Sequence, residues 1–413
     1  MDVFKISLFL NVAFSSKSSL KEKLKKSTKL DYKPKKSPEV FIFLALFILF
    51  FVLVGNKMGG VNLMNTIMNT AYQLLIKTVF YIMAIAVLAG AVSGLFSEFG
   101  VVCLLDRILS PLMKPLYGLP GASVLGIIAP YLSDNPAVLT LADDKEFRHC
   151  FRRYQLPGLT EIGTSFGMGL IITAFMIGLK SPENENFIQA ALIGNLGAFI
   201  GSIFCTRLLL HYSKSTYGTL DMCDPEEETS NFDRTKYRKI REGNVGSRFL
   251  DSMLTGGKSG VDMGLAIIPG VIIICTFVMI LTKGPSDGGV YTGSAFEGVG
   301  FLPFLGEKIS FILKPLFGFT SSECIAVPIT AMGAAGAAIG LVPSLVANGY
   351  AHANDIAVFT AMSMCWSGYL STHVAMMDAL NCKKLTGKAI FCHTLGGLIS
   401  GISAHWLFVL FTL

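Results

Sequence analysis

The sequence predicts an all-α polytopic membrane protein, built from two inverted-topology repeats that each hold a re-entrant helical hairpin, with about seven full spans. Three observations predict this fold: the composition, the apolar runs long enough to cross a bilayer, and a motif that occurs once in each half. Of the 413 residues, 52% are hydrophobic and only 15% are charged, with a mean hydropathy of +0.58. Soluble domains are about 25% charged, so the composition excludes a water-soluble globular protein.

The cysteines and the charges narrow the class further. Nine cysteines occur, an odd number, and no two of them form a Cys-x-x-Cys pair. This pattern excludes a disulfide-stabilised scaffold and a zinc ribbon, and it fits thiols buried in apolar segments. The net charge of +6 has its basic excess in the N-terminal tail. A basic tail on a membrane protein indicates orientation and lipid contact, so no nucleic-acid partner is expected.

Apolar windows divide the chain into a tail, an isolated span, two repeats and a linker. A transmembrane helix needs about 20 mostly apolar residues. We expect a basic cytoplasmic tail over residues 1–38, a first span over 39–58, the first repeat over 59–211, a cytoplasmic linker over 212–260 and the second repeat over 261–413. The full spans are expected at Val40–Val54, Val79–Phe99, Leu156–Leu179, Ile188–Leu210, Met263–Thr282, Asp355–Ala379 and Ala389–Leu413.

Two further apolar stretches, Ser123–Leu141 and Cys324–Val346, are interrupted by prolines and by polar or small residues. Proline removes a backbone donor and blocks the helical turn before it. In hydrocarbon, each freed backbone group costs several kcal/mol unless protein or cavity water satisfies it. We therefore expect both stretches to form re-entrant hairpins that line a cavity. Kinked ordinary spans are the alternative.

Basic clusters set the expected orientation. They lie in the N-terminal tail, after the first hairpin, in the linker between the repeats and before the last span. All four clusters face the cytoplasm only if both hairpins return to the side from which they entered. The expected protein is then a multi-pass protein of the cell inner membrane, with its N-terminus in the cytoplasm and its C-terminus outside.

An internal repeat supports the two-fold organisation. Lys114–Leu119 reads Lys-Pro-Leu-Tyr-Gly-Leu, and Lys314–Phe319 reads Lys-Pro-Leu-Phe-Gly-Phe. Each motif precedes one of the two interrupted stretches. Each repeat holds three crossings, an odd number, so the second repeat must be inverted relative to the first. Inverted repeats with paired discontinuous segments are typical of secondary transporters, whose binding site lies at mid-membrane.

The residues after the second motif carry the strongest chemical signal. A hydroxyl among Thr320, Ser321 and Ser322 can cap the helix that starts there, which places Glu323 in its first turn. An ionisable group at membrane depth marks a functional site by default. We therefore expect Ser321, Ser322 and Glu323 to bind substrate and Glu323 to hold a coupling Na⁺ or H⁺. A capping carboxylate at the membrane interface is the alternative.

The first hairpin offers polar groups but no charge at its tip, where Gly121 and Ser123 are expected to contact the substrate. Asp134 and Asn135 lie at the turn of this hairpin. They could bind a small cation or a hydroxyl group, with Asp134 as a second ion-coupling residue, and Asn348 matches Asn135 in the second repeat. An ordinary Asx turn explains Asp134 and Asn135 equally well.

Polar residues also recur on one face of the span that follows the first hairpin. Glu161 and Thr164 lie on this face and are expected to bind substrate, with Glu161 opposite Glu323 across a cavity. His373, in the corresponding span of the second repeat, is predicted to be a hydrogen-bonded packing histidine rather than a ligand. Neither an HExxH motif nor a nucleophile–base pair occurs, so we expect no enzymatic activity and no cofactor.

On these motifs, residues 60–210 and 260–410 resemble the nucleoside-recognition "gate" domain. This domain occurs in spore-maturation proteins and in the membrane part of the ferrous-iron permease, and it is related to concentrative nucleoside transporters. Ser321-Ser322-Glu323 is similar to the Gln-Thr-Glu run that contacts the nucleoside in those transporters, with the glutamine replaced. Gly318-Phe319, with Cys324 further on, is similar to the Gly-Phe-Gly-Cys run of the permease.

The sequence and the resemblance together predict a secondary transporter of a small polar solute, such as a nucleoside, coupled to Na⁺ or H⁺. The expected partners are this solute and the lipid bilayer, and a homo-oligomer stays open. The permease resemblance leaves a divalent-metal permease as an alternative, with Cys324, Glu323 and His373 as ligands. The spore-maturation resemblance leaves a non-transporting membrane scaffold as another.

Overall fold

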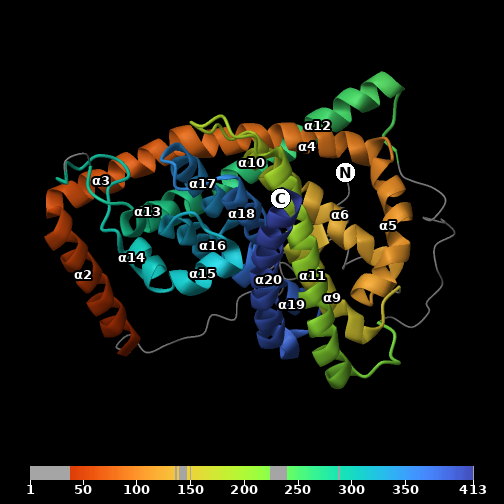
Figure 1. The fold of residues 1–413 in the computed structure, drawn as a ribbon. Coiled ribbons are helices and arrows are strands. Elements are labelled where there is room, and N and C mark those ends of the chain that lie inside the picture. Colours follow the sequence, from red (N-terminus) through yellow and green to blue (C-terminus); the bar gives the residue numbers. More distant parts are fainter. Residues whose placement is uncertain are drawn as a thin grey trace, which may run out of the picture. The chain divides into compact units, whose positions relative to one another are not determined.

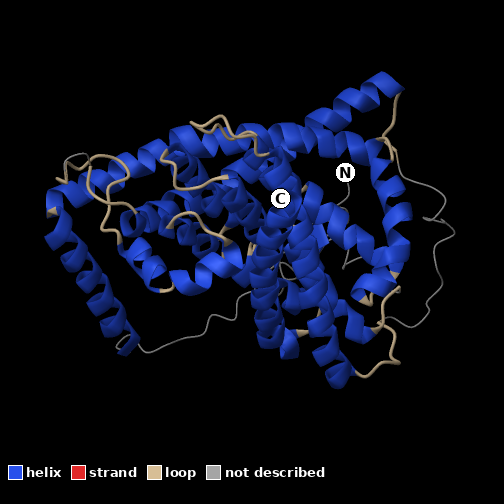
Figure 2. Ribbon diagram, viewed as in Figure 1, coloured by secondary structure: helices blue, strands red, loops and turns tan. Residues whose placement is uncertain are grey.

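The computed structural model describes residues 38–134, 137–138, 147–148, 150–223, 240–286 and 289–412, without the side chains of residues 370–372. Within these ranges the chain is helical, and its one extended pairing is an isolated bridge between Arg152 and Met222 (Figure 2). Six helices are long and apolar enough to cross a membrane, or up to eight if each of two bent helix pairs is one span. The helical membrane fold is thereby confirmed.

The chain separates into two compact units, residues 1–56 and residues 57–413. Helix α2 (Pro38–Met58) holds the described part of the first unit and ends two residues past its boundary; its 21 residues are long and apolar enough for one span. The second unit holds all the other described helices. The boundary lies close to the expected end of the first span at residue 58, whereas the predicted borders between repeats and linker remain predictions.

Two long interrupted helices open the two halves of the second unit. The first joins α3 (Gly60–Gln73), a π-helical turn (Leu74–Val79) and α4 (Phe80–Glu98). The second joins α12 (Val245–Pro269), a π-helical turn (Gly270–Cys275) and α13 (Thr276–Thr282). With 39 and 38 residues, each is about 57 Å long, nearly twice the hydrocarbon thickness. Both therefore exceed the spans predicted from hydropathy at Val79–Phe99 and Met263–Thr282.

Helices α4 and α12 lie against each other with their backbones in contact (Figure 1). A Cβ atom added at Gly90 would lie 2.3 Å from the carbonyl oxygen of Gly256, and one added at Gly94 would lie 2.2 Å from that of Ser252. The numbers rise on one helix as they fall on the other, so the two helices are antiparallel. Small residues four apart allow this close approach, a common device between membrane helices. Antiparallel equivalent helices are what inverted repeats require.

Each bent helix pair has its bend at the repeated motif. Helix α5 (Val101–Tyr117) ends at Gly118 with φ 72°, and α15 (Ser310–Phe317), which follows α14 (Phe301–Lys308), ends at Gly318 with φ 63°. This left-handed backbone conformation favours glycine and terminates a helix. After a short 3₁₀ turn come α6 (Leu125–Leu132) and α16 (Ala326–Ala331). The pairs are bent by 102° and 79°.

In the second repeat α16 is followed by α17 (Ala335–Ala347), which completes the expected hairpin segment. In the first repeat, most of the residues that follow the turn of the expected hairpin lie outside the described residues. That either segment turns back within the bilayer remains a prediction.

The next spans are broken in both repeats, which the hydropathy pattern did not predict. The expected span Leu156–Leu179 consists of α9 (Leu156–Ser165) and α10 (Gly169–Ile177). The expected span Asp355–Ala379 consists of α18 (Ala353–Cys365) and α19 (Tyr369–Ala379) and is not among the six long apolar helices. Met168, with φ 56°, and Gly368, with φ 63°, stand at the breaks. A left-handed residue interrupts the helical hydrogen bonds, so one helix ends and the next begins there.

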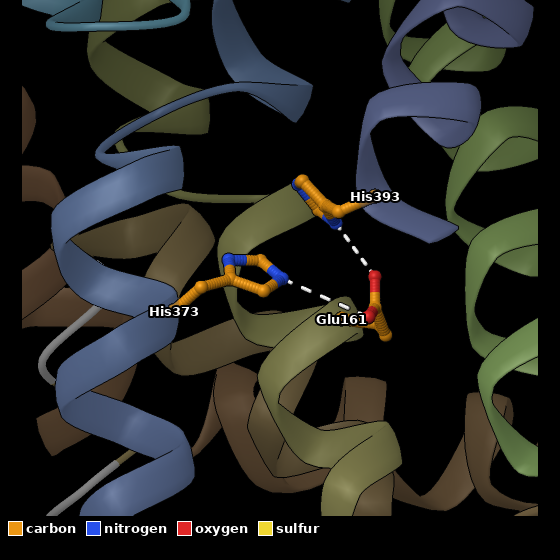
Figure 3. A group of neighbouring side chains, drawn as sticks. All are labelled: Glu161, His373 and His393. Carbon is orange, nitrogen blue, oxygen red and sulfur yellow. Dashed lines mark hydrogen bonds and ion pairs between the residues drawn. The ribbon is translucent and has the colours of Figure 1, made fainter. Parts of the chain in front are cut away.

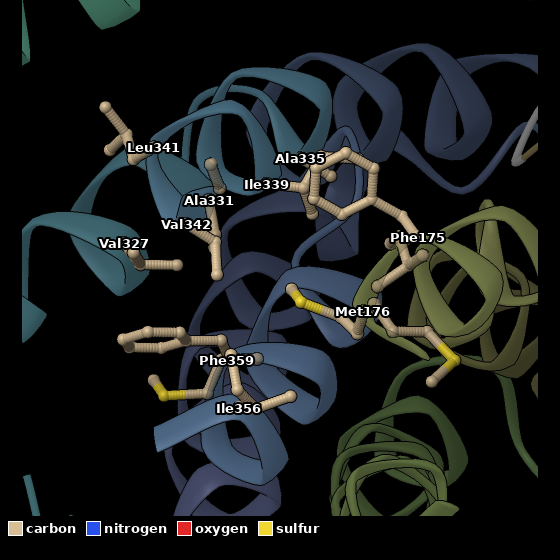
Figure 4. Close-up of a cluster of buried hydrophobic side chains, with 14 of the residues drawn as sticks. Phe175, Met176, Val327, Ala331, Ala335, Ile339, Leu341, Val342, Ile356 and Phe359 are labelled. Carbon is tan, nitrogen blue, oxygen red and sulfur yellow. The ribbon is translucent and has the colours of Figure 1, made fainter. Parts of the chain in front are cut away.

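The closing helices α11 (Ile188–Tyr217) and α20 (Thr386–Thr412) also cross in antiparallel contact. A Cβ at Gly197 would lie 2.6 Å from the carbonyl oxygen of Ser400, and one at Gly201 would lie 2.4 Å from that of Gly396. Around this pair, apolar side chains of α10, α16, α17 and α18 interlock into one buried cluster (Figure 4). The cluster fixes the second hairpin segment against the broken helices.

The loop between α13 and α14 is built around Glu297, whose side chain is 2% exposed. Burial alone would raise the pKa of this carboxyl group. Hydrogen bonds from Ser286, from the backbone and hydroxyl of Thr292 and from the Gly293 N–H outweigh that effect and lower the pKa to about 2. Thr66 of α3 also donates to Glu297, at 3.3 Å. This carboxylate therefore ties the loop to the first long helix.

Candidate functional site

A cavity of about 480 Å³ lies where the helix interruptions of both repeats meet. Asp134 at the end of α6 and Met168 at the α9–α10 break line it from the first repeat. The turn from Gly333 to Ala337 and the α18–α19 break at Ser367 and Gly368 line it from the second repeat, and α12 contributes Asp262. Drug-sized ligands occupy pockets of about 300–1,000 Å³. The cavity therefore has room for a small polar solute and carries two carboxylates.

The tip of the second hairpin segment is a capped turn. Ser321 precedes the 3₁₀ turn Ser322–Ile325, and its hydroxyl both accepts from the Glu323 N–H at 3.4 Å and donates to the Glu323 carboxylate. The Glu323 charge also acts on the ammonium group of Lys283 at the end of α13. Ser321, Ser322 and Glu323 are thus brought together as expected, and both the capping and the binding interpretation of Glu323 stay open.

Asp355, a fully buried residue in the first turn of α18, holds this tip in place. Its carboxylate accepts from the backbone N–H of Thr320 at 3.1 Å, from the Thr320 hydroxyl at 2.6 Å and from the His352 N–H at 3.0 Å. Cys324 is buried beside it and donates to the carbonyl oxygen of Tyr350 at 3.1 Å. Asp355 therefore acts as a positioning residue for the Glu323 turn.

The tip of the first hairpin segment is internally satisfied. The Ser123 hydroxyl is fully buried and donates to the carbonyl oxygen of Pro120 at 2.6 Å. The carbonyl oxygen of Gly121 accepts from the Ser110 hydroxyl of α5 at 3.2 Å. In this structure both residues build the turn, and their predicted contact with a solute remains a prediction.

The remaining hairpin residues are separated. Asp134 lines the cavity, while Asn135 lies outside the described residues. Asn348 follows α17 on the surface and donates to the carbonyl oxygen of Ser344 at 2.5 Å. Among the predicted binding residues that the structure describes, Asp134 is the one that lines the cavity.

A buried polar cluster lies on the helices next to the breaks (Figure 3). Glu161 of α9, His373 of α19 and His393 of α20 all have fully buried side chains. His393 Nδ1 lies 2.7 Å from Glu161 Oε2, and His373 Nε2 lies 3.7 Å from Glu161 Oε1. The donor atoms of the three side chains lie within 4.8 Å of one another, so together they could hold a metal ion. Glu161 was expected opposite Glu323, but its immediate partners are these histidines.

Neighbouring groups hold both imidazole rings in place. His393 Nε2 lies 2.6 Å from the carbonyl oxygen of Cys365, at the end of α18, and the ring stacks on Tyr369 at 5.4 Å between centroids. His373 Nδ1 lies 3.3 Å from the hydroxyl of Thr164. Thr164, predicted to bind substrate, therefore lies beside His373. Cys324, Glu323 and His373 do not form a group with mutual donor distances within 4.8 Å among the described residues.

His393 and Asp355 were missed as site residues in the sequence. Both are ionisable groups inside predicted apolar spans, the signal that singled out Glu161 and Glu323, so the same rule could have found them. The pairing of Glu161 with two histidines about 210 and 230 residues away could not be read from spacing, because α9, α19 and α20 are distant in the sequence and contact one another only in the packed fold.

Comparison with solved structures supports the fold. No protein-family profile and no curated protein sequence matches the chain. Among solved structures, a doubly substituted CNTnw in an outward-facing state is similar over 90% of this chain and 86% of that chain, at 13% identity and a TM-score of 0.50. CNTnw in its intermediate 1 state is similar over 89% and 85%, at 12% identity and a TM-score of 0.50. At this identity the similarity shows a shared helical membrane fold.

Proposed function

We propose that this chain is a secondary transporter that carries a small polar solute through the cavity at the helix breaks. The observation that carries the proposal is the convergence of interruptions from both repeats on one cavity that holds Asp134 and Asp262. Broken helices leave backbone groups and helix ends unpaired in hydrocarbon, where they are tolerated only beside protein or cavity water. Such ends recognise polar and charged parts of a solute in transporters.

The fold also supports the proposal that the chain is a transporter. The similar structures are of a concentrative nucleoside transporter, which makes a nucleoside the first solute to test. Coupling to Na⁺ or H⁺ would pass through Glu323 and Asp134, the acids at the second hairpin tip and at the cavity. Both groups can exchange a cation as the hairpin segments move relative to the long helices.

Uptake into proteoliposomes tests this proposal. Wild-type protein should accumulate a labelled nucleoside when an inward Na⁺ or H⁺ gradient is imposed, and each gradient is applied separately. Glu323→Gln and Asp134→Asn should each abolish gradient-driven accumulation. Glu307→Gln, a matched change at an exposed glutamate of α14, should leave it intact.

The outcome divides the proposal into separable parts. If Glu323→Gln transports as well as wild type, Glu323 is only a cap and drops out of the mechanism. If no nucleoside, nucleobase or other small polar solute in the panel enters under either gradient, the transport proposal fails. A membrane scaffold would behave in this way, although it gives no reason for a 480 Å³ cavity lined by both repeats.

A further inference from the structure

The cluster of Glu161, His373 and His393 contains a mismatch of hydrogen-bonding roles. Glu161 Oε1 and His373 Nε2 are buried, lie 3.7 Å apart and have no hydrogen-bond partner among the described residues. A buried polar atom without a partner costs about 1–3 kcal/mol. One cation between these two facing atoms would give both a partner.

Each histidine ring has one nitrogen near Glu161 and one nitrogen bonded to another group. The bond of the second nitrogen decides whether the nitrogen near Glu161 can act as an acceptor. A carbonyl oxygen only accepts, so His393 must donate from Nε2 to Cys365 and presents the lone pair of Nδ1 to Glu161 when neutral. His373 can donate from Nδ1 to the Thr164 hydroxyl and then presents the lone pair of Nε2. Two nitrogen lone pairs and one carboxylate thus converge on one point.

We propose that Glu161, His373 and His393 bind a divalent transition-metal cation of the Zn²⁺ type. One cation would satisfy all three acceptors at once. Metal-binding histidines usually donate their second N–H to a carbonyl or a similar acceptor; His393 does so to Cys365, and His373 has the Thr164 hydroxyl available for it. Two histidines and one carboxylate form a known type of zinc ligand set.

The distances agree with such a site. Bonds of about 2.1 Å place two ligands of a tetrahedral ion roughly 3.4 Å apart. The 3.7 Å between His373 Nε2 and Glu161 Oε1 already fits. The 2.7 Å contact of His393 with Glu161 Oε2 opens by less than about 1 Å when the ion enters.

Soft donors lie close to the cluster. The thiols of Cys205 and Cys365 each lie 3.8 Å from the hydroxyl of Ser165, which is on α9 with Glu161. Thiols and imidazoles select Zn²⁺ or Fe²⁺ over Mg²⁺ or Ca²⁺. His373 lies five residues beyond Gly368, which lines the cavity, so the cluster is about 8 Å from the cavity wall along α19.

Metal binding to the full-length protein without a histidine tag tests the inference. The exposed group of Glu183, Glu185 and His352 could bind metal adventitiously, so all samples carry Glu183→Gln and Glu185→Gln. Purified protein is loaded with Zn²⁺, dialysed and assayed for metal per chain. A parallel sample is loaded with Co²⁺, whose visible absorption reports nitrogen and oxygen ligands in a tetrahedral site.

We expect one Zn²⁺ per chain and an intense Co²⁺ absorption. Glu161→Gln, which keeps the shape of the side chain, should reduce the bound metal at least tenfold. Thr164→Val removes only the group behind His373 and should weaken affinity by about 10–100-fold, as loss of such outer contacts usually does. Glu323→Gln should bind metal like the parent protein. A monodisperse elution profile for each variant excludes misfolding.

Less than one tenth of a Zn²⁺ per chain in the parent protein would overturn the inference and leave the cluster held by protons. Retention of full metal binding by folded Glu161→Gln would overturn it too. The inference does not rest on the proposed transport: a protein that binds Zn²⁺ here but moves no solute refutes only the transport proposal, and the reverse result refutes only the metal site.

Discussion

Gly90→Ala tests the crossing of α4 with α12, the helix that lines one side of the cavity. The added methyl carbon would lie 2.3 Å from the carbonyl oxygen of Gly256, whereas ordinary van der Waals contact begins at 3.4 Å. The two helices would have to separate by about 1 Å, because the obstacle is backbone and no side chain can move aside. Such overpacking costs about 1–3 kcal/mol.

In a chain of this size, each kcal/mol corresponds to about 2 °C in melting temperature. Gly90→Ala should therefore lower the apparent Tm in detergent by about 2–6 °C. Monodisperse protein remaining after a heating series, measured by size-exclusion chromatography, gives this value. Gly256→Ala should behave alike, since its Cβ would lie 2.1 Å from the Gly90 carbonyl oxygen.

Gly387→Ala in α20 is the matched control, because a Cβ there meets nothing within 4 Å. It should leave Tm unchanged or raise it slightly, since alanine lowers the entropy of the unfolded chain. If Gly90→Ala melts at the same temperature as Gly387→Ala, then α4 and α12 are not in backbone contact. The antiparallel arrangement of the repeats would lose its main support.

Three further outcomes are expected. In the folded protein the pKa of Glu297 is lowered from 4.5 to about 2, so its contribution to stability is present above pH 4.5 and lost as the pH falls toward 2. Glu297→Gln should therefore flatten this part of a profile of Tm against pH. Glu98→Gln should destabilise more than Asp378→Asn in thermal unfolding, because Glu98 is buried against Arg248 at 2.7 Å while Asp378 is half exposed. Ser123→Ala should cost about 1 kcal/mol in unfolding free energy and leave uptake intact if its hydroxyl serves only the turn.

The bends after the repeated motif could be predicted from the sequence, and the reason is local. In both copies of Lys-Pro-Leu-aromatic-Gly the helix ends at the glycine, because Gly118 and Gly318 adopt the left-handed conformation that lets the chain turn. The breaks at Met168 and Gly368 escaped prediction, since no proline marks them and hydropathy runs on across both. The left-handed backbone conformation at these two residues makes the break, and the side chain of Met168 does not indicate that conformation.

The sequence indicated some residues of the site, but not which of them lie together in the fold. Glu161 and Glu323 were singled out because a buried charge is costly in a membrane. Their neighbours depend on helix crossings, which glycines such as Gly201 and Gly396 permit through backbone contact. A search for small residues four apart would have indicated the crossings, but the register that brings His393 to Glu161 follows only from the packed structure.

The central claim is that a water-accessible cavity lies between the two repeats at the helix breaks. A membrane-impermeant thiol reagent can test it, in a background where the partly or fully exposed Cys103, Cys150 and Cys223 are replaced by serine. Ala334→Cys places a thiol on the cavity wall, and Ala338→Cys places one a turn further along α17, where the native side chain is fully buried. We predict rapid labelling at position 334, slowed by transported solute, and none at position 338. Equal labelling at both positions, or none at either, would contradict the account.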